Sequence, residues 1–248
     1  MKTCLMKLGL IALLSLSSLG PRAETLSLVA DEWPPYVDES LPHGGLAIDL
    51  VTAAFARAGY GTQFSRQDWN HALEGARIGV YDVVANIWQT PERARDLDFS
   101  EAYLVNDIRF IKRKSSPFTY ERVDDLQGLL VGVVKGYAYP QEFADYPAVA
   151  KIVHPALLPA LNGLVQGKYD LVVGDKQVID YTLRQFLPNE AKDLEFLDKS
   201  VGQSPLHIAV SRSNPKHGKI VEDFNRAMRE MREDGTYQSI LSAHQSQP

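Results

Sequence analysis

Short apolar runs alternate with amphipathic segments along most of the chain, which is the pattern of strands alternating with helices. The apolar and β-branched runs predict strands at residues 25–30, 130–134, 151–154 and 206–210. The clearest helical segment has its apolar residues on one face and ends at Gly235. These residues are Ile220, Val221, Phe224, Met228 and Met231. Such alternation favours an α/β fold built on parallel sheets.

One sequence pattern occurs twice, at residues 73–84 and again at residues 161–173. Both copies read Leu-x-Gly-x-x-x-Gly-x-Tyr-Asp and continue into an apolar run. Each copy predicts the last turns of a helix, a glycine cap and a short buried strand, so the repeat indicates two similar α/β halves. The glycines at 75, 79, 163 and 167 are predicted to mark helix ends. Because the Tyr-Asp pair recurs, we expect it to serve the architecture rather than a ligand.

The first residues have the pattern of a secretory signal peptide. Lys2 and Lys7 precede an apolar run, residues 8–19, that is too short to cross a bilayer as a permanent helix. We therefore expect residues 1–23 to be removed and the mature protein to reside in the periplasm. Cys4 is the only cysteine and lies before the apolar run, so it predicts neither a lipid anchor nor a disulfide in the mature protein.

Charge and composition argue against several classes of function. The formal net charge is −5, and removal of residues 1–23, which carry three basic residues and no acidic one, makes it −8. An acidic surface disfavours nucleic acid as a partner. The six histidines show no metal-ligand spacing, and no Gly-x-Ser-x-Gly motif occurs. The sequence thus predicts no cofactor and no metal.

The residues that follow the two repeated units are the first candidates for a site. In open parallel sheets, ligands bind beyond the carboxyl ends of the strands. Asn86, Trp88 and Arg93 follow the first unit, and Asp175 follows the second. A cation from one half and an anion from the other suit a zwitterion held between them.

Several segments, taken in order, make the chain resemble the extracellular solute-binding proteins of family 3, the periplasmic amino-acid-binding group that serves ABC importers. These segments are residues 31–36, 45–50, 90–93 with 98–103, 131–136, 169–175 and 234–240. The resemblance implies a two-lobed clamshell with two hinge strands. Lobe 1 would comprise residues 24–103 and 207–248, lobe 2 would comprise residues 108–203, and the hinges would be residues 103–107 and 203–207.

The resemblance also implies roles for individual residues. Arg93 matches the arginine that takes a ligand α-carboxylate through two parallel hydrogen bonds, and Asp175 matches the carboxylate that receives the α-ammonium. Trp33 and Trp69 match two aromatic positions that sandwich the ligand side chain.

The remaining positions that the resemblance implies belong to the strand lining the pocket and to a loop of lobe 2. They are Asn86 and Trp88 in the strand and Gly136, Tyr137 and Ala138 in the loop. Trp88 and Tyr137 depart from the family pattern, which commonly has a small hydroxyl residue at each position, so the pocket is expected to be bulkier. Asp31, beside Trp33, could receive a polar or cationic ligand tip.

Each of these residues has a structural alternative. Arg93 could pair with Glu92 or Asp96 at a helix start, Asp175 could be the N-cap of the following helix, and Trp88 could be ordinary core. Asp175 can serve both purposes if one carboxylate oxygen caps the helix while the other faces the cleft.

The resemblance implies a monomeric binding protein that captures an amino acid or close analogue and presents it to the membrane permease of an ABC importer. A second hypothesis keeps the binding but has the closed form signal to a membrane sensor kinase or cyclase. A third is an enzyme like the cyclohexadienyl dehydratases, which need a carboxylic acid shortly after the lobe 2 aspartate. Residues 176–179 contain no acid, so we expect no enzyme activity.

Overall fold

The computed structural model describes residues 23–245, in which no helix combines the length and apolarity needed to cross a membrane. A signal peptide is expected at residues 1–23, and residues 1–22 of it lie outside the described residues. The fold is mixed α/β, as predicted, and all its strands belong to one ten-stranded sheet.

The strands run in the order β2-β1-β3-β10-β5-β8-β6-β7, with β4 paired to β10 and β9 paired to β5. Their bounds are β1 Thr25–Ala30, β2 Gly61–Arg66, β3 Val83–Trp88, β4 Leu97–Phe99, β5 Leu104–Arg113, β6 Leu130–Val134, β7 Ala150–His154, β8 Leu171–Asp175, β9 Leu194–Phe196 and β10 Gly202–Ser211. The four predicted strands are therefore confirmed as β1, β6, β7 and part of β10. The expectation of parallel pairing holds for β1 with β2 and β3, and for β6 with β7 and β8. It is wrong for β4, β5, β9 and β10, which pair only antiparallel.

Seven α-helices cover this sheet in the described part of the chain. They are α1 Leu46–Arg57, α2 Trp69–Arg77, α3 Gln141–Ala144, α4 Leu157–Val165, α5 Lys176–Phe186, α6 His217–Glu233 and α7 Thr236–Gln245. The helix predicted from the apolar face near residues 220–231 is α6, and Gly235 follows it with φ 83°. All five apolar residues of that face are buried.

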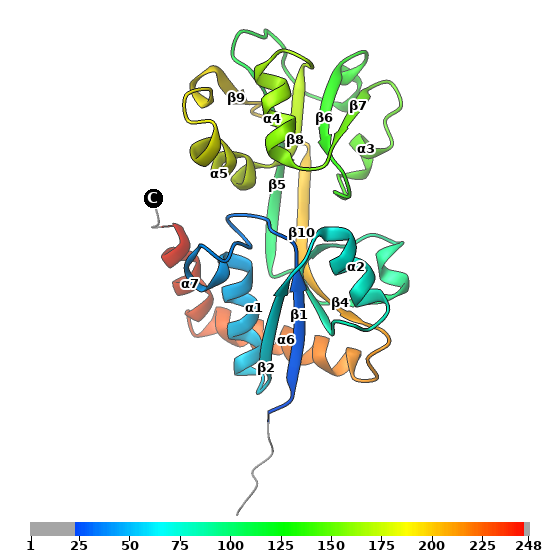
Figure 1. The fold of residues 1–248 in the computed structure, drawn as a ribbon, viewed down its shortest axis with the longest axis vertical. Helices are drawn as coiled ribbons and strands as arrows, with labels where there is room; N and C mark the ends of the chain where they lie inside the picture. Colours follow the sequence, from blue (N-terminus) through cyan, green and yellow to red (C-terminus); the bar gives the residue numbers. More distant parts are fainter. Residues whose placement is uncertain (1–22, 246–248) are drawn as a thin grey trace, which may run out of the picture.

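The elements separate into two lobes joined by β5 and β10 (Figure 1). One lobe holds β1, β2, α1, α2, α6 and α7, and the other holds β6, β7, β8, α3, α4 and α5. β5 and β10 pair antiparallel across the waist, from Leu104 opposite Leu206 to Ile108 opposite Gly202. The hinge segments expected at residues 103–107 and 203–207 coincide with this pairing, and motion about them stays a prediction.

The repeated sequence pattern forms the same unit, a helix followed by a strand, in each lobe. The unit is α2 with β3 in one lobe and α4 with β8 in the other. All residues of β3 and β8 are buried, as the apolar runs predicted. Gly79 and Gly167 follow the helices with φ 77° and 71°, which explains why glycine stands there. The prediction that the other two glycines also mark helix ends is wrong, because both lie inside their helices.

Those internal glycines make room for the repeated tyrosines. A Cβ at Gly75 would lie 2.7 Å from the Tyr81 ring, and a Cβ at Gly163 would lie 2.6 Å from the Tyr169 ring. Because real Cβ atoms do not approach so closely, each tyrosine requires glycine on the helix that it covers.

The repeated aspartates fix the neighbouring strands in the same way in both lobes. Asp82 accepts a hydrogen bond from the Ser27 backbone N–H at 2.9 Å, and Asp170 accepts one from the Leu130 backbone N–H at 2.9 Å. Each aspartate thus joins its own unit to the strand alongside, β1 in one lobe and β6 in the other. The geometry gives the Tyr-Asp pair the architectural role expected from its recurrence.

Candidate functional site

A cavity of about 710 Å³ lies between the lobes. Its wall comes mainly from segments at or beyond the carboxyl ends of β1, β2, β3, β6 and β7, together with residues of α5. The lining residues from the first lobe and the hinge strand β10 are Asp31, Glu32, Trp33, Pro34, Arg66, Gln67, Asp68, Trp69, Asn86, Ile87, Trp88, Arg93 and Leu206. Those from the second are Val134, Lys135, Gly136, Tyr137, Pro155, Ala156, Leu157, Leu158, Val178, Thr182 and Phe186. Strand ends thus meet at one cleft, where open α/β sheets bind their ligands.

Two hydrogen-bond acceptors stand together in this wall. Burial raises the pKa of Asp31 to about 6, and its own backbone N–H, the Asn86 amide and the charge of Arg93 each offset part of the rise. The Asn86 side chain is only 4% exposed, and its Oδ1 has no hydrogen-bond partner among the described residues. A buried acceptor without a partner is costly, so this part of the wall favours a ligand that donates hydrogen bonds.

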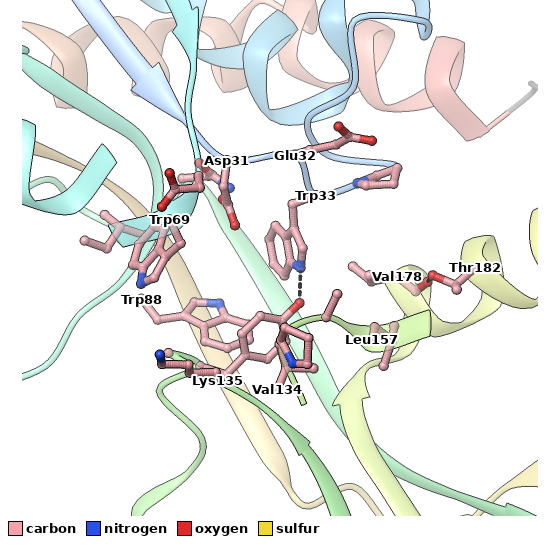
Figure 2. A pocket seen from close by; sticks show the side chains of 18 of the residues that line it. Asp31, Glu32, Trp33, Trp69, Trp88, Val134, Lys135, Leu157, Val178 and Thr182 are labelled. Atoms are coloured by element: carbon pink, nitrogen blue, oxygen red, sulfur yellow. Dashed lines mark hydrogen bonds between the residues drawn. The ribbon is translucent and has the colours of Figure 1, made fainter. Parts of the chain in front are cut away.

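All three tryptophans of the chain line the cavity around that pair. Asp31 points toward the space between Trp69 and Trp33, with Trp88 below it (Figure 2). Trp33 and Trp88 meet edge to face with ring centroids 5.5 Å apart. Trp88 also belongs to the buried core, so its pocket and core interpretations both hold.

Arg93 lines the cavity and is tied to both lobes. Its guanidinium donates to the Trp88 carbonyl at 2.6 Å and to the Gly136 carbonyl at 2.9 Å, and it stacks on the Trp69 ring at 4.9 Å. Burial lowers the pKa of Arg93 to about 10. Because a guanidinium has five N–H donors, these two bonds leave others for a ligand carboxylate.

The alternative pairing of Arg93 with Glu92 or Asp96 is wrong. Both carboxylates lie against Arg77 instead, at 3.1 Å and 3.5 Å. Arg93 is 8% exposed and has turned inward toward the cleft, where it meets backbone carbonyls rather than surface acids.

Asp175 ends β8 and is the N-cap of α5, as its structural alternative predicted. Its Oδ1 accepts from the Val178 N–H at 2.9 Å, and the Tyr36 hydroxyl of the other lobe lies 3.3 Å and 3.5 Å from the two carboxylate oxygens. The residue is 1% exposed and is not among those that line the cavity in the described part of the chain. Burial raises the pKa of Asp175 to about 6, and the Val178 N–H, Asn106 and Tyr36 lower it in part.

The lobe 2 loop predicted at residues 136–138 reaches the cavity through its first two residues. Gly136 has φ 83°, and a Cβ there would lie 2.9 Å from the Trp69 ring, so glycine alone lets the loop come this close. The Tyr137 hydroxyl accepts a hydrogen bond from Trp33 Nε1 at 2.6 Å (Figure 2). Ala138 packs partly buried against the core and is outside the cavity wall.

The second lobe adds an apolar wall that sequence reasoning missed. Leu157 and Leu158 begin α4, and Val178 and Phe186 come from α5. Phe186 is 58% exposed, so this wall reaches the outer surface of the cleft. The cavity is therefore lined by charged and aromatic side chains on one lobe and by largely apolar side chains on the other.

The sequence matches the family model of bacterial extracellular solute-binding proteins, family 3, over residues 27–246. The chain belongs to this family. Its members are the amino-acid-binding proteins of ABC transporters, and they share the two-lobed fold described above.

Relatives of this family 3 chain are named as binding proteins. ABC transporter arginine-binding protein 1 of Escherichia coli K12 is 27% identical over 242 residues, which cover 94% of this chain and 96% of that protein. The structure of an ancestral arginine-binding protein bound to glutamine is 28% identical, with a TM-score of 0.73 over 88% of this chain and 96% of that one. A histidine kinase sensor domain, 22% identical with a TM-score of 0.77 over 91% and 97% of the two chains, shares the fold.

Two further residues of this family 3 site escaped sequence reasoning. Tyr36 stands in a segment that carried the resemblance, and its hydroxyl meets Asp175. Asn106 lies in β5 and accepts from Trp88 Nε1 at 2.8 Å. Asn106 could have been found from the sequence, because it lies inside a predicted hinge strand and a buried polar side chain needs hydrogen-bond partners.

Proposed function

We propose that this protein captures an amino acid or close analogue between its lobes and delivers it to an ABC importer in the periplasm. The acceptor pair of Asp31 and the unpartnered Asn86 Oδ1, set among three tryptophans, is the observation that carries this proposal. A carboxylate and an amide oxygen beside aromatic faces suit an ammonium or guanidinium group, which they hold by charge, hydrogen bonds and cation-π attraction.

Arg93 provides the opposite charge for a carboxylate of the ligand. Its guanidinium is fixed in orientation by the Trp88 and Gly136 carbonyls, which lowers the entropy that binding would otherwise lose. Arginine-binding relatives in this family support a ligand that carries both charges. We therefore favour a cationic amino acid, with its cationic group at Asp31 and a carboxylate at Arg93.

The test is thermal melting of the mature protein with L-arginine, L-lysine, L-glutamine and L-cystine, followed by calorimetric titration of any hit. A ligand at 100 times its Kd adds about 2.7 kcal/mol, which corresponds to a rise in Tm of roughly 5 to 10 °C for a chain of this size. Asp31→Asn should abolish the rise for a cationic ligand. The exposed Glu142→Gln, outside the cavity wall, is the control and should preserve it. No rise with any of the four would refute the proposal.

Delivery is tested separately: where a permease and an ATPase are encoded beside this gene, they are reconstituted in proteoliposomes. Ligand-loaded protein should stimulate ATP hydrolysis, and the Asp31→Asn protein should not. If no importer subunits are encoded nearby and the loaded form instead alters the activity of a membrane kinase or cyclase, the signalling alternative is correct. The ligand should be recovered chemically unchanged, because we propose binding without catalysis.

A further inference from the structure

Asp175 lies behind the cavity wall, although the helix that it caps contributes to that wall. Its carboxylate is engaged by the Val178 N–H and by the Tyr36 hydroxyl, and the Tyr36 side chain is itself only 2% exposed. Val178 and Thr182 of the same helix reach the cavity. The carboxylate is thus turned toward the other lobe's Tyr36 and away from the space open to a ligand.

Three aromatic rings of the cavity wall form one cluster. Trp33, Trp88 and Tyr137 all line the cavity and meet edge to face, with ring centroids 5.5 Å, 6.3 Å and 5.3 Å apart. The Trp33 ring also packs 4.7 Å from Tyr36, and Trp88 Nε1 donates to Asn106. Tyr36 and Asn106 are outside the cavity wall in the described part of the chain, and both bond Asp175.

Tyr137 is the member of this cluster that comes from the second lobe, and its ring packs on both Trp33 and Trp88. Burial raises the pKa of Tyr137 well above its usual value, and the charges of Asp31 and Asp175 both raise it further. Its hydroxyl is held by Trp33 Nε1 at 2.6 Å, so the ring has a fixed orientation. The ring thus packs on the two tryptophans whose neighbours, Tyr36 and Asn106, bond Asp175.

We propose that Tyr137 determines specificity by closing the inner end of the cavity, so that a ligand is read by Asp31 and Arg93 and does not touch Asp175. This inference rests on the proposed function. It narrows the ligand class of that function to compounds that bind without placing a cationic group against the Asp175 carboxylate. Asp175 then acts as a positioning residue that caps α5 and joins it to Tyr36. A small residue at position 137 would open the path between the cavity and that carboxylate.

The experiment is a double-mutant cycle measured by calorimetric titration with L-arginine and L-lysine as probes. Wild type, Tyr137→Ser and Tyr137→Phe are each compared with and without Asp175→Asn, because asparagine keeps the N-cap and removes the charge. In the wild type and in Tyr137→Phe, which keeps the ring, Asp175→Asn should change Kd less than about threefold. In Tyr137→Ser the same substitution should raise Kd about tenfold or more, as loss of a charged hydrogen bond does.

Two results would overturn the inference while leaving the proposed function intact. One is a tenfold rise in Kd on Asp175→Asn in the wild type, and the other is an equal response to Asp175→Asn with serine or tyrosine at position 137. In both cases Asp31→Asn would still weaken binding. If neither probe binds the wild type, the preference for a cationic amino acid fails and the inference fails with it, whereas the proposed function stands if L-glutamine or L-cystine raises Tm. Melting of each protein without ligand shows whether a lost affinity reflects lost folding.

Discussion

Replacement of Asp31 by asparagine should stabilise the protein at neutral pH while abolishing capture of a cationic ligand. Burial raises the pKa of Asp31 from its usual 3.8 to about 6, so ionisation is harder in the folded than in the unfolded state. The full shift corresponds to about 3 kcal/mol at pH 7.5. Since the side chain borders the cavity and is partly solvated, we expect Asp31→Asn to gain about 1 to 3 kcal/mol, or roughly 3 to 8 °C in Tm.

The pH dependence fixes the sign of this effect. The folded pKa lies above the unfolded one, so the cost of charging Asp31 is fully present above pH 6 and disappears as pH falls below about 4. The advantage of the variant over the wild type should therefore fall to about half at pH 5 and vanish near pH 3. Scanning calorimetry without ligand at pH 7.5, 5 and 3 measures it. The exposed Glu32→Gln should stay within about 0.5 kcal/mol of the wild type. A less stable Asp31→Asn protein at pH 7.5, or a difference that does not change with pH, would refute the reasoning.

Three further outcomes follow from the contacts described above. Binding of L-arginine should weaken roughly fivefold between pH 6 and pH 5 as Asp31 becomes protonated, in calorimetric titrations, and an unchanged Kd would contradict that role. Arg93→Lys should lower the free energy of unfolding by about 1 to 3 kcal/mol in urea titrations, because one amine cannot satisfy both the Trp88 and Gly136 carbonyls and also stack on Trp69. Gly163→Ala should cost about 1 to 3 kcal/mol through collision with Tyr169, whereas Gly218→Ala, on an open helix face, should be neutral or stabilising. Equal midpoints for these two alanine variants would contradict the packing explanation.

Local patterns in the sequence were sufficient to predict the repeated units. The recurring glycines, tyrosines and aspartates act within a few residues of one another or on the adjacent strand, so their spacing alone indicated the same construction in both lobes. Even there, the place of Gly75 and Gly163 inside the helices was missed. It depends on where a tyrosine ring packs, which the sequence pattern does not state.

It was harder to predict where the side chains of the site point than to predict which residues lie at the cleft. Asp31, Trp69 and Arg93 follow strands or begin a helix at the cleft, so the order of elements places them. The turn of Asp175 toward Tyr36, by contrast, is set by a contact between residues 139 positions apart, and the Trp33 to Tyr137 bond joins residues 104 apart. Such contacts depend on how the two lobes meet, and the hydrophobic periodicity within either lobe does not predict this arrangement.

The path of the chain through the first lobe bears on how the protein is assembled. β3, whose residues are all buried in the finished fold, has β10 as a neighbour, and β10 begins only at Gly202. During synthesis from the N-terminus, β1 to β3 emerge long before the strand and helices that cover them. β6, β7 and β8 follow one another without such a gap. We expect the later half to mature first, leaving the earlier half dependent on holdase chaperones until the last residues arrive.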